Sequence, residues 1–438
     1  MFRYYFLLGV RSLRRNPALT TLMILTLAIG VAASVSTLTI LHVMSGDPIP
    51  HKSAKLLVPV IDNGPLKGYT PGKPQEDNQM SYRDVVNLLA GKQGLRRTAV
   101  FGVAGGIEPA RSDLPVVDVN GLAVTSDYFT MFETPFLHGT GWSADQDSSG
   151  AAVIVLSRQQ SEKMYGKENP VGRRLRFLAN DFQVVGVLDT WNPMPRYTHL
   201  INGNGGSFDG EDEIFIPVST ATRLQVRPSG SITCQDNVTP GYQGFLDSDC
   251  TWLQFWFELK STADRPALQN YLDAYASEQK KFGRLPRQSP PRLYNVMEWM
   301  EVLHIVHSDS KLSVWLAFGF LLLCLVNTVG LLLAKFSVRA SEVGVRRALG
   351  ATRTEIFKQF LVETAVVGLA GGLLGLPLSF VGLRMIVNQS AGLSVLPQMD
   401  WFMLGTTFLL SVTASVLAGL LPTWRACQVT PALQLKSQ

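Results

Sequence analysis

Few residues of this chain have the types and spacing that catalysis or metal binding requires. His304 and His307 are three positions apart, so on a helix they would share a face and could hold a metal ion. A polar pair beside a membrane segment is the favoured interpretation. Four loop carboxylates are expected to be solvated rather than catalytic: Asp145, Asp147, Asp247 and Asp249.

Nucleotide chemistry is not encoded in its usual form. The sequence contains no Gly-x4-Gly-Lys-Ser/Thr run, the loop whose backbone cradles phosphates, and residues 203–206 form a glycine-rich loop without the lysine. A His-Glu-x-x-His metal motif is also missing from the sequence. We therefore predict no catalytic residue, no metal site and no cofactor in this chain.

The four cysteines do not have metal-ligand spacing. If the middle of the chain is extracytoplasmic, Cys234 and Cys250 could form a disulfide across a loop rich in Gly, Asp and Asn. A loop of that size would contribute about 3 kcal/mol in the chain-entropy description. Two unpaired thiols remain the alternative. For Cys324 and Cys427 we expect packing roles.

Composition indicates several membrane spans joined to a water-soluble region. The 438 residues are 46% hydrophobic with a mean hydropathy of +0.14, which is too apolar for an ordinary soluble protein and too polar for a protein embedded throughout. The net charge of +5 requires no nucleic-acid partner, because basic residues gather at the ends of the apolar segments.

Four apolar segments are long enough to cross a bilayer. They are predicted at 17–43, 311–334, 364–383 and 401–424. Residues 17–41 carry no charge, and a retained span is favoured there over a signal peptide, whose apolar core is normally shorter. Residues 1–16 suit an amphipathic helix on the cytoplasmic face. A short outer loop at 384–400 and a cytoplasmic tail at 425–438 complete the topology, which places both termini inside.

The region 44–310 is soluble in character and is predicted to be an α+β domain, large enough for two subdomains. Ser81 is expected to cap a helix over 81–89. Residues 174–187 predict a hairpin with its turn at Asn180 and Asp181. Residues 252–260 alternate as a half-buried strand, and an amphipathic helix follows over 265–282. Residues 294–310 are expected to form a helix running into the second span.

A charged elbow at 335–363 connects the second and third spans. Its six basic and three acidic residues favour the cytoplasmic side. Gly350 can stop a first helix in the left-handed conformation, and Thr352 with Glu355 can open a second one through a capping box. On composition alone, a loop that only sets topology is the alternative.

The residues of this elbow resemble a known family. The run Arg339-Ala-Ser-Glu-Val-Gly-Val-Arg-Arg-Ala-Leu-Gly-Ala351 is similar to the coupling helix of ABC permeases of the MacB/LolC/FtsX superfamily. The stretches VTSDYF (124–129), MYGKENPVG (164–172), EIFIPVSTA (213–221) and GLLPTWRA (419–426) also resemble it. Trp424 and Ser341 depart from the usual pattern of the family.

The resemblance implies that the elbow docks on a cytoplasmic ATPase subunit, which holds the ATP and Mg²⁺. Polar contacts are expected from Arg339, Glu342, Arg346 and Arg347. Gly344 and Gly350 would set the backbone shape, and Ile356 with Phe357 would seat the elbow against an apolar groove or the membrane. Two permeases, identical or related, would pair in the bacterial inner membrane, and a periplasmic adaptor is a further possible partner.

By the same resemblance, ATP-driven movement would be relayed to the outer domain by mechanotransmission. Export of drugs, peptides or other small molecules is the preferred function. Lipoprotein release and the regulation of cell-wall enzymes without transport are the alternatives. A membrane-tethered periplasmic enzyme has no supporting set of residues.

Overall fold

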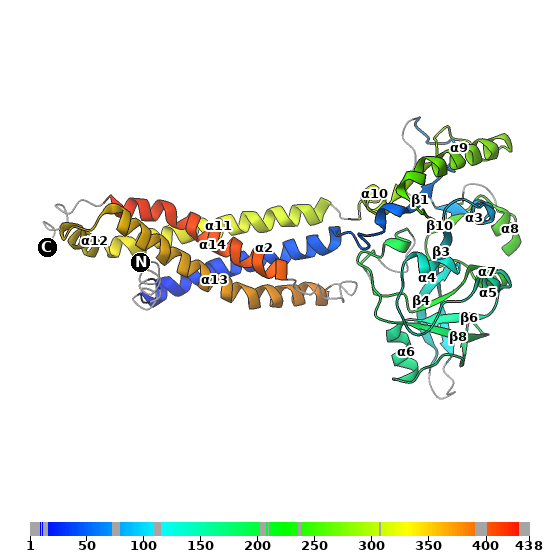
Figure 1. The fold of residues 1–438 in the computed structure, drawn as a ribbon, viewed down its shortest axis with the longest axis horizontal. Coiled ribbons are helices and arrows are strands. Elements are labelled where there is room, and N and C mark those ends of the chain that lie inside the picture. The colour runs from blue at the N-terminus through cyan, green and yellow to red at the C-terminus, as the bar shows by residue number, and fades with distance from the viewer. Residues whose placement is uncertain are drawn as a thin grey trace. The chain divides into compact units, whose positions relative to one another are not determined.

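The computed structural model describes residues 9, 11, 16–71, 79–108, 115–201, 207–208, 210–234, 238–305, 308–389 and 401–428. The chain forms two compact units, one from Met1–Val43 with His307–Gln438 and the other from Met44–Val306 (Figure 1). Most of the predicted amphipathic helix at 1–16, most of the outer loop at 384–400 and of the tail at 425–438, and His307 lie outside the described residues.

The first unit, called the membrane unit here, is helical. Its elements are α2 (Pro17–Ser45), α11 (Ser308–Val338), α12 (Ala340–Ala348), α13 (Arg353–Gln389) and α14 (Trp401–Cys427). Among the described residues, four helical segments are long and apolar enough to cross a membrane: Pro17–His42, Leu312–Val338, Arg353–Met385 and Leu409–Cys427. The predicted number and order of spans are confirmed. The second and third helices extend beyond their predicted bounds, because α11 and α13 continue into the elbow.

Small residues of α13 allow its neighbours to approach closely. A Cβ on Gly368 would lie 1.9 Å from Oγ of Ser415 in α14, and one on Gly371 would lie 3.2 Å from Cβ of Leu27 in α2. The Ser411 hydroxyl donates to the Gly368 carbonyl at 2.6 Å. These glycines therefore pack helices of one chain against each other, in the way small residues do in membranes.

The second unit, called the soluble unit, is built on one mixed sheet. Its described strands are β1 (Leu56–Val60), β2 (Met80–Ser81), β3 (Arg96–Glu108), β4 (Val117–Val124), β5 (Phe136–Gly139), β6 (Val153–Leu156), β7 (Arg174–Phe177), β8 (Asn180–Leu188), β9 (Ile214–Pro217), β10 (Thr251–Glu258) and β11 (Arg292–Asn295). The main order is β11-β1-β10-β3-β4-β9-β6-β8-β5. The pairs β4–β9 and β6–β8 are parallel, and the other pairs are antiparallel.

Helices cover both faces of this sheet. They are α3 (Tyr82–Ala90), α4 (Asp127–Met131), α5 (Ala144–Ser148), α6 (Arg158–Tyr165), α7 (Val218–Arg223), α8 (Tyr242–Asp247), α9 (Arg265–Lys281) and α10 (Val296–Val302). Ser81 accepts the Asp84 amide and caps α3 as predicted. The amphipathic helix predicted over 265–282 is α9, in which Leu268, Leu272 and Tyr275 are buried.

Two hydrophobic cores lie on the two faces of the sheet. Along β10, Phe255 and Phe257 belong to one core and Trp256 to the other, so every residue of this strand is buried. A strand buried on both faces was not predicted, because the alternation of aromatic residues indicated one solvent-facing side. The described strands of this unit all belong to one continuous sheet.

Two local predictions were wrong. The hairpin turn falls at Leu178 and Ala179, with φ of 50° and 59°, and Asn180 already pairs with Phe177. Leu178 leaves no room for a Cβ on Gly105 of β3, so packing holds this turn in place. One helix over 294–310 was expected, but the end of β11 and the short helix α10 occupy 294–302, His304 has φ 49°, and α11 begins at Ser308.

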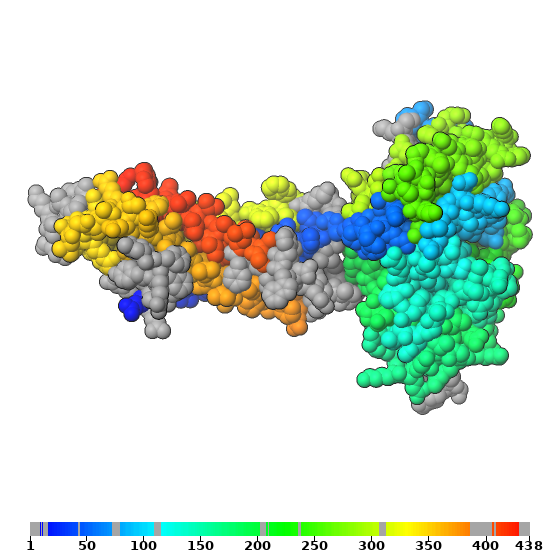
Figure 2. All heavy atoms as spheres, viewed as in Figure 1, coloured from blue at the N-terminus to red at the C-terminus, as the bar shows by residue number. Residues whose placement is uncertain are grey.

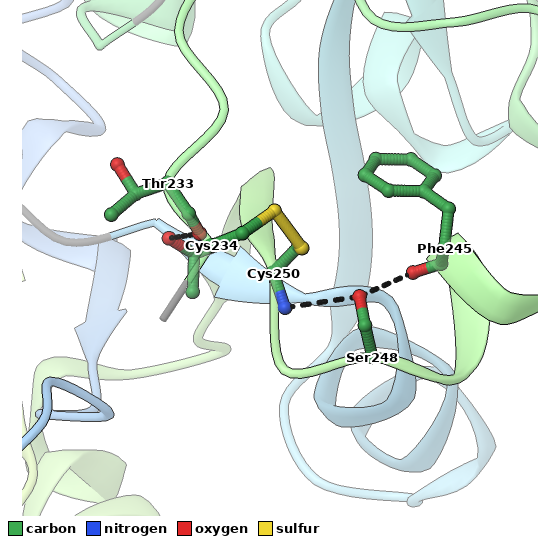
Figure 3. Close-up of a disulfide and its surroundings, with 6 residues drawn as sticks. Thr233, Cys234, Phe245, Ser248 and Cys250 are labelled. Atoms are coloured by element: carbon green, nitrogen blue, oxygen red, sulfur yellow. Dashed lines mark hydrogen bonds between the residues drawn. A yellow bond between two sulfur atoms is a disulfide. The ribbon is translucent and has the colours of Figure 1, made fainter. Parts of the chain in front are cut away.

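A disulfide joins Cys234 to Cys250, as Figure 3 shows. Cys250 is buried directly before β10, and its amide donates to the Ser248 hydroxyl at 3.2 Å. Thr233 and Thr251, the neighbours of the two cysteines, pair through backbone hydrogen bonds in both directions. The disulfide and the backbone hydrogen bonds thus join the same two segments, one at Thr233 and Cys234 and the other at Cys250 and Thr251.

One titratable side chain is buried without hydrogen bonds to its ring. His199 is 2% exposed, and neither ring nitrogen has a partner in the described residues. Burial, with a smaller effect from the Arg196 charge, lowers the pKa of His199 to about 3 from its ordinary 6.5. The folded protein therefore holds this ring neutral far below the pH at which the unfolded chain protonates it.

This burial predicts acid sensitivity of the soluble unit. Between pH 6.5 and 3 only the unfolded chain binds a proton at His199, so the free energy of unfolding should fall as the pH drops, by about 2 kcal/mol at pH 5. We expect His199→Phe to lose less thermal stability between pH 7 and pH 5 than the wild type, followed by tryptophan fluorescence. His138→Phe, at a half-exposed position in β5, is the control. An unchanged pH dependence in His199→Phe would contradict this account.

Candidate coupling site in the membrane unit

The elbow consists of two helices separated by a tight turn. Helix α12 ends at Ala348 with Leu349 as its C-cap, and Gly350 adopts φ 101°. The Gly350 amide donates to the Arg347 carbonyl at 3.1 Å and the Ala351 amide to the Arg346 carbonyl at 3.0 Å. These two bonds form a Schellman stop, which favours glycine at the left-handed position. The predicted stop is therefore present.

The second helix begins with the predicted capping box. The Thr352 amide donates to Glu355 Oε2 at 3.0 Å, and the Glu355 amide donates to Thr352 Oγ1 at 3.3 Å. Helix α13 then continues from Arg353 without a break through the third span. Any rotation of the elbow must therefore be shared by the span.

A buried ion cluster joins the elements at the base of the elbow. The Glu363 carboxylate is 2% exposed, and Lys335 Nζ lies 2.7 Å from it. Arg339 donates to both Glu363 oxygens, at 2.9 and 3.1 Å. Lys335 belongs to α11, Arg339 precedes α12, and Glu363 belongs to α13. Arg339 was expected to contact an ATPase, but the structure turns it inward as part of this cluster.

The remaining charged residues of α12 stay near the surface. Arg346 forms an ion pair with Glu342 at 2.6 Å and also donates to Gln359 at 3.0 Å. The half-buried Arg347 donates to the Cys427 carbonyl at 3.4 Å. Glu342 and Arg346 thus form an exposed intrahelical pair, which contributes little to stability in itself.

The apolar residues of the elbow divide into two faces. Val343, Gly344 and Ile356 are buried, and Ile356 packs in a cluster with Phe336 and Phe360, whose rings are 4.4 Å apart. Phe357 is partly buried at the edge of this cluster. Ile356 was expected to seat the elbow against a partner or the membrane, but it belongs to the internal packing of the unit.

Two exposed apolar residues were missed by the sequence analysis. Val345 is 52% exposed and Leu349 is 83% exposed. They are four positions apart, so they share the outer face of α12 with Glu342 and Arg346. We call these four residues the α12 patch; Figure 2 shows the stretch around α12 (yellow) at the surface of the membrane unit. The sequence did contain a signal for them: two apolar residues four positions apart in a helix that is too short to form a core of its own.

These features define a class of protein. Four membrane-spanning helices carry a charged elbow between the second and third, and a large α+β unit is inserted after the first. Membrane permeases with an outer domain have this organisation. Residues 20–275 match the MacB-like periplasmic core domain, and residues 314–431 match the FtsX-like permease C-terminal domain. The chain belongs to this family of MacB-like ABC permeases, and the predicted family is confirmed.

The relatives are distant and longer. The macrolide export ATP-binding/permease protein MacB of Bdellovibrio bacteriovorus is 24% identical over 98% of this chain, which covers 61% of that protein. The pyoverdine export ATP-binding/permease protein PvdT of Pseudomonas entomophila is 26% identical over 70% of this chain, or 41% of its own length. The crystal structure of the periplasmic region of MacB from Actinobacillus actinomycetemcomitans, 13% identical, covers 58% of this chain and 95% of that one with a TM-score of 0.36.

The ion cluster predicts a stability effect. Glu363→Gln leaves Lys335 and Arg339 buried beside a neutral partner, and breaking a buried pair in this way is expected to remove about 3–5 kcal/mol. Thermal denaturation of the full chain in detergent, read by size-exclusion chromatography, should show the loss. Adding Lys335→Met should restore part of it. Glu355→Gln, which keeps the capping box, is the matched control, and equal losses in both glutamine variants would refute the assignment.

Proposed function

We propose that this chain is the permease subunit of an ATP-driven ABC transporter, which transmits ATPase motion to its periplasmic unit and thereby exports small molecules. The observation that carries this proposal is the α12 patch, where Val345 and Leu349 are exposed beside the Glu342–Arg346 pair. An apolar centre with a charged rim is the usual composition of a protein interface. The partner proposed for this patch is a cytoplasmic ABC ATPase.

The ion cluster supports the proposal that a force on α12 is transmitted to the membrane helices. A force on α12 reaches α11 and α13 through Lys335, Arg339 and Glu363, because separating these groups would leave an uncompensated charge in a buried place. Since α11 and α13 are themselves spans, the elbow and the membrane helices would move together. This arrangement favours mechanotransmission over a loop that only sets topology.

The sequence of the spans supports an external source of energy. Residues 17–41, 312–334, 364–383 and 401–424 contain no Asp, Glu, Lys, Arg or His, whereas ion-coupled carriers keep such a group at membrane depth. Lys335 and Glu363 belong to the longer described spans but lie at their elbow ends. The sequence also has no phosphate-binding Gly-x4-Gly-Lys-Ser/Thr loop. We therefore propose that ATP and Mg²⁺ bind to a separate ATPase subunit.

The proposed assembly follows from the family. Two permease copies, or two related chains, would stand in the bacterial inner membrane with both termini in the cytoplasm, each binding one ATPase. A periplasmic adaptor is a further proposed partner. The relatives MacB and PvdT are named for the export of macrolides and pyoverdine, which supports export over lipoprotein release or enzyme regulation.

The test exchanges the charges of the patch. The double variant Glu342→Lys/Arg346→Glu keeps an i,i+4 ion pair within α12 but reverses both charges that a partner meets. We expect the ABC ATPase recovered with the purified wild-type chain to fall at least about tenfold with the variant, a loss of about 1.4 kcal/mol or more. Quantitative mass spectrometry of the purified complex, with ATPase activity as a second readout, measures this.

The matched control is Arg158→Glu/Glu162→Lys, the same exchange in the exposed i,i+4 pair of α6 in the soluble unit. This control should leave ATPase recovery unchanged, and both variants should insert in the membrane at wild-type levels. Equal recovery of the ATPase with wild type and the α12 variant would remove the basis of the proposal.

A further inference from the structure

A cleft of about 380 Å³ opens within the soluble unit, apart from the coupling site. Its walls come from α3 on one side and from α5 and the starts of α4 and α7 on the other. Figure 1 shows these helices in the same unit, with α5 and α7 beside each other. Segments separated by more than a hundred residues in the sequence therefore meet at this cleft.

One wall is apolar. Val86 is 43% exposed, Leu89 is half-buried, and Val85 is buried beneath them, all on the same side of α3. A half-exposed valine and leucine that line a hollow are suited to contact with an apolar group of a ligand.

The opposite wall is charged. Asp147 of α5 accepts the Ser126 amide at 2.7 Å and faces the Ser219 hydroxyl at 3.4 Å. Asp127 of α4 accepts the Arg97 amide at 3.1 Å. Arg97 also lines the cleft. Two carboxylates and one guanidinium give the cleft a formal charge of −1. Sequence analysis placed Asp147 on a solvated surface, whereas the structure places it half-buried in this wall.

The Asp147 carboxylate lacks full compensation for its burial. Burial is the largest cause that raises its pKa, the hydrogen bonds from Ser126 and Ser219 lower it, and the Asp127 charge raises it further. The nearby guanidinium of Arg97 donates to the Gln93 carbonyl at 2.9 Å. A positive group in the cleft would offset the unfavourable free energy of burying the Asp147 charge and would reduce the repulsion between the two carboxylates.

We propose that this cleft is a binding site for a monocationic amphiphile, with an ammonium group at Asp147 and Asp127 and an apolar body on Val86 and Leu89. The charge of the wall selects one positive group, and the volume, near the lower end of the range for ligand sites, limits the ligand to a small amine or the first two residues of a peptide. The site is independent of the proposed ATPase coupling.

The experiment uses the full chain in lipid nanodiscs with empty nanodiscs as the blank. Two cationic probes, leucyl-leucine amide and 4-phenylbutylamine, are compared with their neutral analogues, N-acetyl-leucyl-leucine amide and 4-phenylbutanol, by microscale thermophoresis. We expect at least one cationic probe to bind at least about tenfold more tightly than its analogue. Binding of the dipeptide amide alone identifies a peptide N-terminus as the ligand group, and binding of 4-phenylbutylamine alone identifies a small amine.

Variants locate the site. Asp147→Asn should weaken the cationic probe at least about tenfold, and Val86→Ser, at a half-exposed position outside the cores, should weaken it about threefold. Asp145→Asn, on the same short helix but outside the cleft, should bind as the wild type does. The proposal is overturned if neither amine binds the wild type, if the neutral analogues bind as tightly, if Asp145→Asn weakens binding as much as Asp147→Asn, or if both cleft variants bind like the wild type.

Discussion

The membrane unit depends on one carboxylate, Glu363, placed between two cations in a buried position. An isolated charge in such surroundings is unfavourable, and only close ion pairs with good hydrogen bonds make it acceptable. The cations come from the end of α11 and the start of α12, and the carboxylate comes from α13. A shift of any one of these elements alone would separate opposite charges, so the cluster ties the elbow to two spans electrostatically.

In the soluble unit the corresponding constraint is burial on both faces of the sheet. Strand β10 has no solvent-facing residue, and its Glu258 forms a buried ion pair with Lys52. Two further buried pairs of this unit are Arg284–Asp84 and Arg287–Asp62. A core packed from both sides resists local deformation, because every side chain has neighbours that must move with it. Such a unit is suited to respond to force as a body.

Features determined by a few neighbouring residues were predictable from the sequence. The four spans, the Gly350 stop and the Thr352–Glu355 capping box each follow from local patterns, and the structure contains all of them. The inward turn of Arg339 and the burial of Ile356 were not predictable, since each depends on residues of other helices. The turn at Leu178 and Ala179 was also missed, because packing of Leu178 on Gly105 outweighed the local preference for Asn and Asp.

The link between Cys234 and Cys250 has a consequence for biogenesis. Cytosolic thiols are kept reduced, so this bond can form only after translocation delivers the segment to an oxidising compartment. Since Cys250 directly precedes the central strand β10, the bond is made beside the middle of the sheet, in a segment that has left the cytosol. Oxidation of these two thiols is therefore a folding step that belongs to the far side of the membrane.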